Sequence, residues 1–386
     1  MPGAWGRVVS QHGQALPVLK SAGDVLREMG VTTMRSGGSV SQSMRWKDWR
    51  GPMWSRPSND QVWGDSLLAG WGPFEVIDMC AALSIEPIIT LAYDVNDVED
   101  FADLVEYAFG DPVKTAWGKR RAADGHPDIY NVTVFELGNE QYNPFFVEQV
   151  AAMEQRAKAV GAPPLHYMFP SNGGLNPADI AKYEALGLPA DRYMPDLHVG
   201  AGGAVGAARG LFGGNPAFKQ SAINCETNAG SHDQTRALNE AADLIDFFTA
   251  ETSVTDRIYA RTASFCTGTS TQFDQWDQGI SFFLPNGTYL QPPGYVHKMI
   301  SSTWAEETLQ AKSSGGSANF HVAAQRQRSG GSGKPQLVLR LVNGDGGKQD
   351  VQLSIDGAQL AQGTPCTMDT LAVRLLVSRA CADTRD

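Results

Sequence analysis

The sequence has few of the features that mark membrane proteins or nucleic-acid-binding proteins. No apolar run approaches the roughly 20 residues that a helix needs to cross a bilayer, so we expect no membrane partner. Lysine and arginine form no cluster, and the 386 residues carry a net charge of −11 with a pI near 5.1. A surface of this charge does not neutralise phosphates, which argues against a nucleic-acid partner. A neutral substrate rich in hydroxyl groups suits the composition, whereas a polyanion does not.

Metal and nucleotide cofactors are not predicted either. The five cysteines are widely spaced and form neither a CxxC pair nor a Cys/His cluster of the kind that holds zinc. No GxGxxG or GxxxxGKS/T motif opens a helix, so a nucleotide cofactor is not expected. The first residues, from Met1 to Trp5, show no charged region followed by an apolar one, and no signal peptide is visible.

What the chain does contain is a regular alternation of strand and helix patterns. Residues 17–29 have apolar positions at helical spacing, and residues 31–35 form the strand pattern that follows. Residues 87–92 are apolar throughout, as in a parallel strand buried on both faces. The series continues to a helix at 294–304, which predicts an α/β protein with a (β/α)8 TIM barrel rather than an open doubly wound sheet. The residues before 17 show no convincing strand, so we expect the first barrel strand to be missing.

A second domain is predicted from about residue 306 onward. Gly/Ser-rich turns there separate alternating runs such as 336–342 and 350–355, which is the pattern of antiparallel strands. We therefore divide the chain into an N-terminally incomplete barrel at 1–305 and a smaller antiparallel β-sandwich domain at 306–386.

Two of the predicted strands end on glutamate. The strand at 132–137 leads into Asn139 and Glu140, and the strand at 221–224 leads into Glu226. In a barrel, residues at the C-terminal ends of strands face the active-site mouth. An isolated Asn-Glu pair is more often a helix cap, but two strand ends of this kind supply a pair of carboxylates. We predict that Glu140 and Glu226 are the catalytic residues.

Paired carboxylates across a barrel mouth are suited to glycoside cleavage. In retaining enzymes one carboxyl protonates the leaving oxygen while the other attacks the anomeric carbon, and the two stand about 5 Å apart. Burial and a neighbouring negative charge keep the acid protonated, and hydrogen bonds keep the nucleophile ionised. Asn139, beside the acid Glu140, is placed to bond the sugar 2-hydroxyl.

The loop from Met44 to Trp71 is long and rich in aromatic residues, proline and glycine. It contains five tryptophans: Trp46, Trp49, Trp54, Trp63 and Trp71. Tryptophan faces stack on sugar rings, so one interpretation is a carbohydrate cleft. The alternative is that the loop packs on the barrel, which is the commoner role for any single tryptophan.

Nine short segments match one known family. They are 37–39, 45–48, 51–52, 56–57, 117–118, 125–127, 130–132, 135–140 and 291–296. On these residues the sequence resembles glycoside hydrolase family 51, the α-L-arabinofuranosidases, within the clan of retaining barrel glycosidases. The segment Leu137–Glu140 is typical of the clan, and the loop at 37–57 is typical of the family. The resemblance covers residues from near 17 to about 355.

The resemblance implies a role for each matching polar residue. Glu140 corresponds to the acid/base, Glu226 to the nucleophile, and Asn139 to a ligand of the 2-hydroxyl group. His198 matches a family histidine that lines the sugar pocket; without the match it would be interpreted as a capping or buried structural histidine. The resemblance also implies that no metal or organic cofactor takes part and that the protein is secreted.

The sequence departs from the family pattern at several positions. Ser39 stands where the family has asparagine in its Pro-Gly-Gly-Asn loop, and we predict that Ser39 and Trp46 also bind substrate. Arg35 is one place away from the family arginine, so no role is transferred to it. The residues around His198 and Glu226 lack the usual aromatic neighbours. These changes bear on sugar specificity rather than on the chemistry.

We therefore predict an exo-acting, retaining α-L-arabinofuranosidase whose partner is an arabinose-containing polysaccharide or oligosaccharide. One rival is another retaining barrel glycosidase, such as a β-xylosidase or an endoglucanase. A second rival is a truncated, inactive homologue that binds glycans through its tryptophan loop. The missing first strand favours the second rival, and the Glu140/Glu226 pair opposes it. The oligomeric state is left open.

Overall fold

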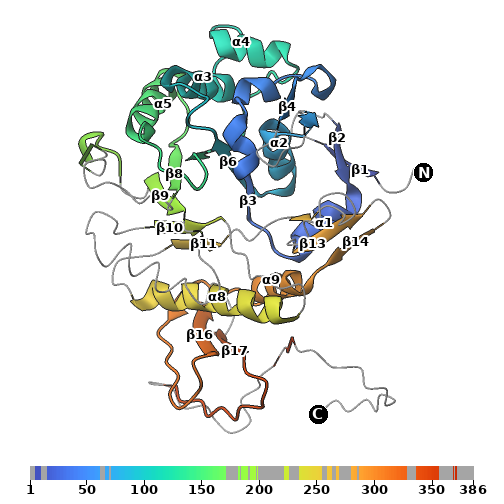
Figure 1. Cartoon of the computed structure of the whole chain (residues 1–386), viewed down its shortest axis with the longest axis vertical. Coiled ribbons are helices and arrows are strands. Elements are labelled where there is room, and N and C mark those ends of the chain that lie inside the picture. Colours follow the sequence, from blue (N-terminus) through green and yellow to red (C-terminus); the bar gives the residue numbers. More distant parts are fainter. Residues whose placement is uncertain are drawn as a thin grey trace.

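The computed structural model describes most of the chain (Figure 1). The described residues are 5–9, 15–60, 66–68, 71–170, 181–182, 184–189, 192–196, 198, 221–225, 234–253, 259–262, 267–268, 280–284, 287–327, 336–355, 368 and 370–371. All structural statements below concern these residues. Within them, no helix is long and apolar enough to cross a membrane.

The main sheet has seven parallel strands in the order β3-β6-β7-β8-β9-β10-β11, so each strand pairs with its neighbours in the sequence. The strands are β3 (Thr33–Ser36), β6 (Glu86–Leu91), β7 (Val134–Leu137), β8 (His166–Pro170), β9 (Tyr193–Asp196), β10 (Ser221–Asn224) and β11 (Tyr259–Thr262). In Figure 1 they follow a curved path with helices on the outside. This order is that of a TIM barrel, and the predicted α/β fold class is confirmed.

The helices between the strands bury their apolar faces against the sheet. They are α1 (Lys20–Glu28), α2 (Pro73–Leu83), α3 (Val98–Phe109), α4 (Ala116–Ala123), α5 (Phe146–Val160), α8 (Gln234–Ser253) and α9 (Pro292–Ser302). Asp97 caps α3 by accepting a hydrogen bond from the amide of Asp100 at 2.8 Å, as its place before an acidic first turn predicts. Strand β6 is buried along almost its whole length, which confirms the apolar run.

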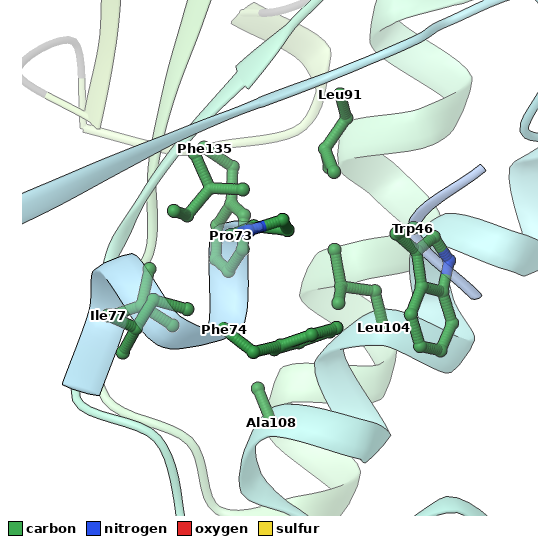
Figure 2. A pocket seen from close by; sticks show the side chains of 10 residues that line it. Trp46, Pro73, Phe74, Ile77, Leu91, Leu104, Ala108 and Phe135 are labelled. Carbon is green, nitrogen blue, oxygen red and sulfur yellow. The ribbon is translucent and has the colours of Figure 1, made fainter. Parts of the chain in front are cut away.

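A small pocket lies between the sheet and these helices (Figure 2). It is lined by Trp46 and nine apolar residues from the sheet and from the helices, with Phe74 and Leu104 among the side chains drawn. Because the pocket has no convergent polar groups, it lacks what a sugar site requires and is a packing gap of the core.

Within the described part of the chain, β3 and β11 each have a sheet neighbour on one side only. An eighth strand between them would close the barrel. The N-terminal residues form instead an antiparallel hairpin of β1 (Trp5–Val9) and β2 (Ala15–Leu19), separate from the main sheet. The expectation of no strand before the first helix was therefore wrong. Pro17 suggested a helix start, but a two-stranded hairpin has free edges on which proline is tolerated.

Short strands form two further small sheets. One consists of β4 (Ser58–Asp60) and β5 (Ser66–Leu68), and the other of β12 (Thr267–Gly268), β13 (Ser281–Leu284) and β14 (Gly287–Leu290). Three 3-10 turns, at Ser39–Ser43, Trp46–Trp49 and Met53–Ser55, shape the loop after β3.

The C-terminal part forms a separate three-stranded antiparallel sheet, as the alternating runs in this region predicted. Its strands are β15 (Glu307–Leu309), β16 (Phe320–Gln327) and β17 (Gln336–Asn343). Ala323 and Val342 pack on Ile245 and Phe248 of α8, which separates this sheet from the barrel (Figure 1). The described residues supply one layer of the expected sandwich.

Candidate active site

Asn139, Glu140 and His198, three of the polar residues predicted at strand ends, lie at one edge of the main sheet. All strands of a parallel sheet have their carboxyl ends on the same side, so residues that follow β7 and β9 come together there. The Nδ1 atom of His198, two residues after β9, lies 2.9 Å from Oε1 of Glu140, three residues after β7. These residues are 58 positions apart in the sequence.

Glu140 is held in an uncommon backbone conformation. Its φ angle is 52°, in the left-handed region that non-glycine residues seldom adopt. Gly138 also has a positive φ, of 114°, so the chain turns sharply between strand and helix. Asn143 stabilises the turn by donating to the carbonyl of Leu137 at 2.9 Å. Strained, partly exposed residues of this kind cluster at functional sites, and the Glu140 side chain is 39% exposed.

A buried ion pair lies beneath this turn. Arg35, in β3, donates from Nε and Nη2 to the two carboxylate oxygens of Glu136 at 2.6 and 2.8 Å. The same Nη2 donates to Oδ1 of Asn139 at 2.6 Å, and the Thr90 hydroxyl donates to Glu136. The side chains of Arg35 and Glu136 are 3% and 0% exposed. Asn139 is thus fixed by an arginine to which the family resemblance assigned no role.

A second chain of polar contacts runs from Asp196 to Glu140. Oδ2 of Asp196 lies 2.7 Å from Nε2 of His198, whose other ring nitrogen faces Glu140. The backbone amide of Cys225 donates to Oδ1 of Asp196 at 2.8 Å, and Arg35 lies 3.9 Å from Oδ2. Asp196 therefore connects the Arg35–Glu136 ion pair with His198 and Glu140. No sequence pattern had singled it out.

The environments of the two buried carboxyls differ in their effect on ionisation. Burial and the charge of Asp196 raise the pKa of Glu136 to about 7, although Arg35 acts in the opposite direction. Burial also opposes ionisation of Asp196, but the hydrogen bond from His198 and the charge of Arg35 outweigh it and lower the pKa of Asp196. Asp196 is therefore the more readily ionised of the two buried carboxyls.

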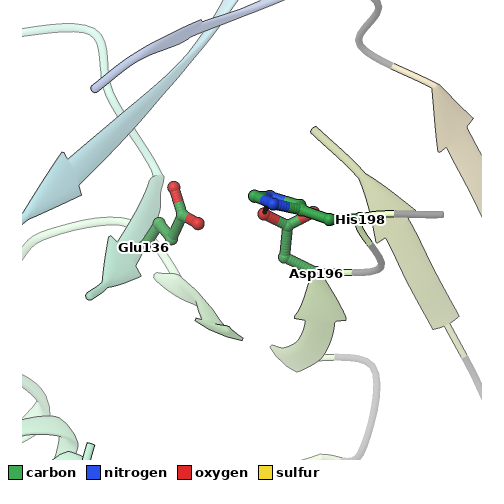
Figure 3. Close-up of side chains that lie close together, drawn as sticks. All are labelled: Glu136, Asp196 and His198. Atoms are coloured by element: carbon green, nitrogen blue, oxygen red, sulfur yellow. Dashed lines mark hydrogen bonds and ion pairs between the residues drawn. The ribbon is translucent and has the colours of Figure 1, made fainter. Parts of the chain in front are cut away.

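Glu136, Asp196 and His198 have potential ligand atoms within 4.8 Å of one another (Figure 3). A carboxylate pair with an imidazole has the donor chemistry of a divalent metal site. Here the Arg35 guanidinium already binds both oxygens of Glu136, and its positive charge lies 3.9 Å from Asp196. A divalent cation at this position would be repelled by the guanidinium, so the cluster fits an ion-pair network better than a metal site.

One further predicted residue, Ser39, has a clear position. Ser39 opens the 3-10 turn after β3, and its Oγ accepts a long hydrogen bond from Nδ2 of Asn139 at 3.4 Å. Gln42, which sequence reasoning missed, donates to the carbonyl of Asn139 at 2.7 Å. Glu226 lies outside the described residues; it directly follows Cys225, which is completely buried.

Trp46 does not reach the site. It is 2% exposed, its ring packs against Phe74 and Trp117, and its Nε1 donates to the carbonyl of Asp100 at 2.9 Å. Lys47 adds an ion pair to Asp100, which ties the loop to α3. Of the two interpretations of this tryptophan, the structure shows packing, and we correct the substrate-binding prediction for Trp46.

Two exposed aromatic residues follow Glu140 in the chain. Tyr142 and Phe145 are 40% and 51% exposed, whereas Phe146 is buried in the core. Aromatic faces beside a polar site offer stacking surface for sugar rings. No pattern in the sequence distinguishes these two exposed rings from buried ones such as Phe146.

The fold and this edge define the class: a (β/α) barrel protein with carboxylates and an imidazole gathered at the carboxyl ends of its strands. Comparison with known proteins then gives the family. Residues 25–165 match the family model described as the alpha-L-arabinofuranosidase 1 domain. This segment, which carries Arg35, Glu136, Asn139 and Glu140, is about a third of the chain and is similar to that domain.

Two curated relatives are similar over about a third of the chain or less. A probable alpha-L-arabinofuranosidase C of Aspergillus niger is 28% identical over 138 residues, which are 35% of this chain and 27% of that protein. An extracellular exo-alpha-L-arabinofuranosidase of Streptomyces chartreusis is 33% identical over 125 residues, 28% of this chain and 15% of that protein. The matched regions thus span about a quarter of these relatives or less.

Solved structures support the fold over a longer stretch. An α-L-arabinofuranosidase of Thermotoga maritima in complex with arabinose has a TM-score of 0.61 at 18% identity, covering 85% of this chain and 76% of that one. A family 51 enzyme of Thermotoga petrophila has a TM-score of 0.61 at 16% identity, covering 83% and 76%. The likeness in fold covers more of the chain than residues 25–165.

Proposed function

We propose that this protein is a retaining glycoside hydrolase that releases terminal, non-reducing α-L-arabinofuranosyl residues from arabinose-containing polysaccharides or oligosaccharides. The observation that carries the proposal is the position of Glu140. It is a partly exposed carboxyl on a strained turn at the carboxyl edge of the sheet, 2.9 Å from His198, within the segment matched by the family model.

In the proposed reaction Glu140 is the acid/base. It protonates the glycosidic oxygen as the bond to the anomeric carbon breaks, and Glu226 attacks that carbon to form an ester. Water then attacks the ester while Glu140, now a carboxylate, accepts its proton. The support for Glu226 is its place in the sequence directly after β10, three strands along the sheet from the strand that precedes Glu140.

Asn139 and Ser39 are proposed to bind the sugar. Because Arg35 holds Oδ1 of Asn139 at 2.6 Å, the amide NH2 group is oriented away from the ion pair and toward Ser39. An amide fixed in this way is preorganised to bond a sugar hydroxyl. His198 lines the same pocket, and Trp46 is left out of the proposal because it is buried.

We also propose that the protein acts outside the cell. The Streptomyces chartreusis relative is described as extracellular, and polymeric arabinose-containing glycans are met there. The chemistry of the proposed reaction requires no metal or organic cofactor, because two carboxyls supply the proton and the nucleophile.

The proposal is tested with a panel of 4-nitrophenyl glycosides and with arabinan. The protein should hydrolyse the α-L-arabinofuranoside at least about 100-fold faster than the β-D-xylopyranoside or β-D-glucopyranoside, because a sugar hydroxyl misplaced in a hydrogen-bonding site is strongly rejected. Glu140→Gln and Glu226→Gln should each lower kcat by about 100-fold or more. Glu148→Gln is the matched control, since Glu148 is a half-exposed surface glutamate paired with Lys182 at 3.7 Å. A preference for a β-pyranoside, or full activity of both site variants, would refute the proposal.

A further inference from the structure

We propose that His198, held in one tautomer by Asp196, positions Glu140 and keeps its carboxyl protonated until a glycosidic bond is cleaved. The inference rests on the proposed function, because it gives His198 a task in the step for which Glu140 is the acid. It goes beyond contact with the sugar. It gives Asp196 and His198 a role in holding the proton of Glu140 rather than in binding the substrate.

The geometry of the two contacts fixes the tautomer. Asp196 is buried and ionised, so its Oδ2 accepts a hydrogen bond, and Nε2 of His198 at 2.7 Å must carry a proton. In the neutral imidazole the other nitrogen, Nδ1, then has a lone pair and no proton. Asp196 is itself fixed by the Cys225 amide at 2.8 Å, so the ring has little freedom to turn.

The contact between Nδ1 and Glu140 follows from this tautomer. A lone pair on Nδ1 bonds Oε1 of Glu140 at 2.9 Å only if the carboxyl carries the proton. The alternative is a protonated imidazole that donates to an ionised carboxylate. In both forms one proton lies between Nδ1 of His198 and Oε1 of Glu140.

When the shared proton lies on Glu140, the reaction proceeds without a change in the charge of His198. The Glu140 carboxyl leaves Nδ1, turns toward the substrate, and transfers its proton to the glycosidic oxygen, which keeps the electron pair of the broken bond. In the second step the Glu140 carboxylate takes a proton from the attacking water and returns to Nδ1. The 39% exposure of the Glu140 side chain leaves room for this movement. His198 is thus a positioning residue, and Glu140 alone touches the reacting atoms.

The charged groups around His198 come from four strands of the sheet. Within the described residues they are Asp196 at the end of β9, Glu136 and Glu140 on or after β7, Arg35 on β3, and the thiol of Cys225 after β10. Arg35 pairs with Glu136, which leaves Asp196 as the carboxylate in direct contact with the imidazole. A loss of the Asp196 charge should therefore weaken the hold of the pair on its proton.

The test compares two substrates that differ in their need for an acid. Arabinobiose has an alcohol leaving group and depends on protonation, whereas 2,4-dinitrophenyl α-L-arabinofuranoside has a leaving group stable as an anion. His198→Asn should lower kcat/KM on arabinobiose by about 100-fold, near the lower end for general acid catalysis, and on the dinitrophenyl substrate by less than about 5-fold. The alkaline limb of its pH profile should move to lower pH by about one unit. Addition of imidazole should restore part of the activity.

Two further variants make the result decisive. Asp196→Asn keeps the imidazole but removes the acceptor that fixes its tautomer, and it should show the same pattern with a smaller loss. This variant provides the test if His198→Asn does not fold, as judged by circular dichroism. His321→Asn is the control, because His321 also pairs with an aspartate, Asp246 at 2.9 Å, in the contact between β16 and α8.

The possible outcomes separate the two proposals. Equal losses on both substrates, or an alkaline limb that does not move, would overturn the inference alone, since a purely structural role affects both substrates alike. A wild-type protein that cleaves neither substrate would overturn the proposed function, and the inference with it.

Discussion

Arg35 and Glu136, 101 residues apart in the sequence, form a bidentate ion pair whose two hydrogen bonds measure 2.6 and 2.8 Å. The pair connects β3 to β7 inside the sheet, and Arg35 also donates a hydrogen bond to Asn139. The residue beside the proposed acid is therefore positioned by a buried charge network. Its rigidity depends on both partners, because a lone buried charge is costly.

The first prediction concerns this ion pair. Arg35→Met should lower the free energy of unfolding by about 3–5 kcal/mol, because Glu136 is left as an unpaired buried charge. The double variant Arg35→Met/Glu136→Leu should regain at least half of that loss. Urea unfolding monitored by tryptophan fluorescence measures both. If the losses of Arg35→Met and Glu136→Leu simply add in the double variant, the two residues are not energetically coupled.

The second prediction concerns the pH dependence of stability. The pKa of Glu136 is raised to about 7 in the folded protein, above its ordinary value of 4.5, so the folded state binds this proton more tightly than the unfolded state. The stability contributed by this proton is complete below pH 4.5 and is lost as the pH rises to about 7.

Glu136→Gln does not titrate and serves as the reference for this effect. The difference in Tm between wild type and Glu136→Gln should be more favourable to the wild type at about pH 5 than at about pH 7.5. Differential scanning calorimetry at the two pH values measures it. A difference that is constant, or that favours the wild type more at the higher pH, would mean that Glu136 is fully ionised in the fold.

The third prediction tests whether Trp46 packs in the core or binds the sugar. Trp46→Ala should lower the free energy of unfolding by about 3–5 kcal/mol, because a large buried ring leaves a cavity. Trp46→Phe should be milder and should leave KM for the arabinofuranoside within about 2-fold of wild type. Trp54→Ala is the control for stability, since Trp54 is 88% exposed. A large rise in KM for a stable Trp46→Phe variant would restore Trp46 to the sugar site.

The fourth prediction concerns Gly37, the first residue of the segment 37–39. A Cβ atom at Gly37 would lie 2.1 Å from Cβ of Thr90, which bonds both Arg35 and Glu136. Gly37→Ala should therefore displace Thr90 and cost about 1–3 kcal/mol of stability, the range for overpacking, with a loss of kcat. Gly346→Ala is the matched control, because nothing lies within 4 Å of a Cβ atom there. Equal Tm values for the two variants would contradict the close approach.

Local patterns were sufficient to predict the fold class and the placement of Glu140. The uniform apolarity of β6 and the cap at Asp97 are local signals, and the strand that leads to Asn139 and Glu140 follows from the same alternation. Such signals depend on neighbours in the sequence, so one chain is enough to detect them.

The contacts of Arg35 and Asp196 depend on sheet register, which local patterns do not encode. Thr90 stands opposite Glu136 in the pairing of β6 with β7, and Arg35 joins them from β3. A shift of one residue would turn Arg35 to the other face of the sheet. The resemblance to the family had placed Arg35 one position away from the functional arginine, so only the structure brought it into the site. Trp46 shows the converse, since composition does not distinguish a buried aromatic residue from one that stacks on sugar.

The most direct test of the central claim, that Glu140 is the acid/base of a retaining glycosidase, is the product that Glu140→Ala forms with sodium azide. With 2,4-dinitrophenyl α-L-arabinofuranoside, azide should accelerate turnover and yield α-L-arabinofuranosyl azide, because it attacks the glycosyl ester on the face that water normally uses. The product is identified by NMR. A β-configured azide would make Glu140 the nucleophile, and the absence of any azide product together with unchanged activity would contradict the account.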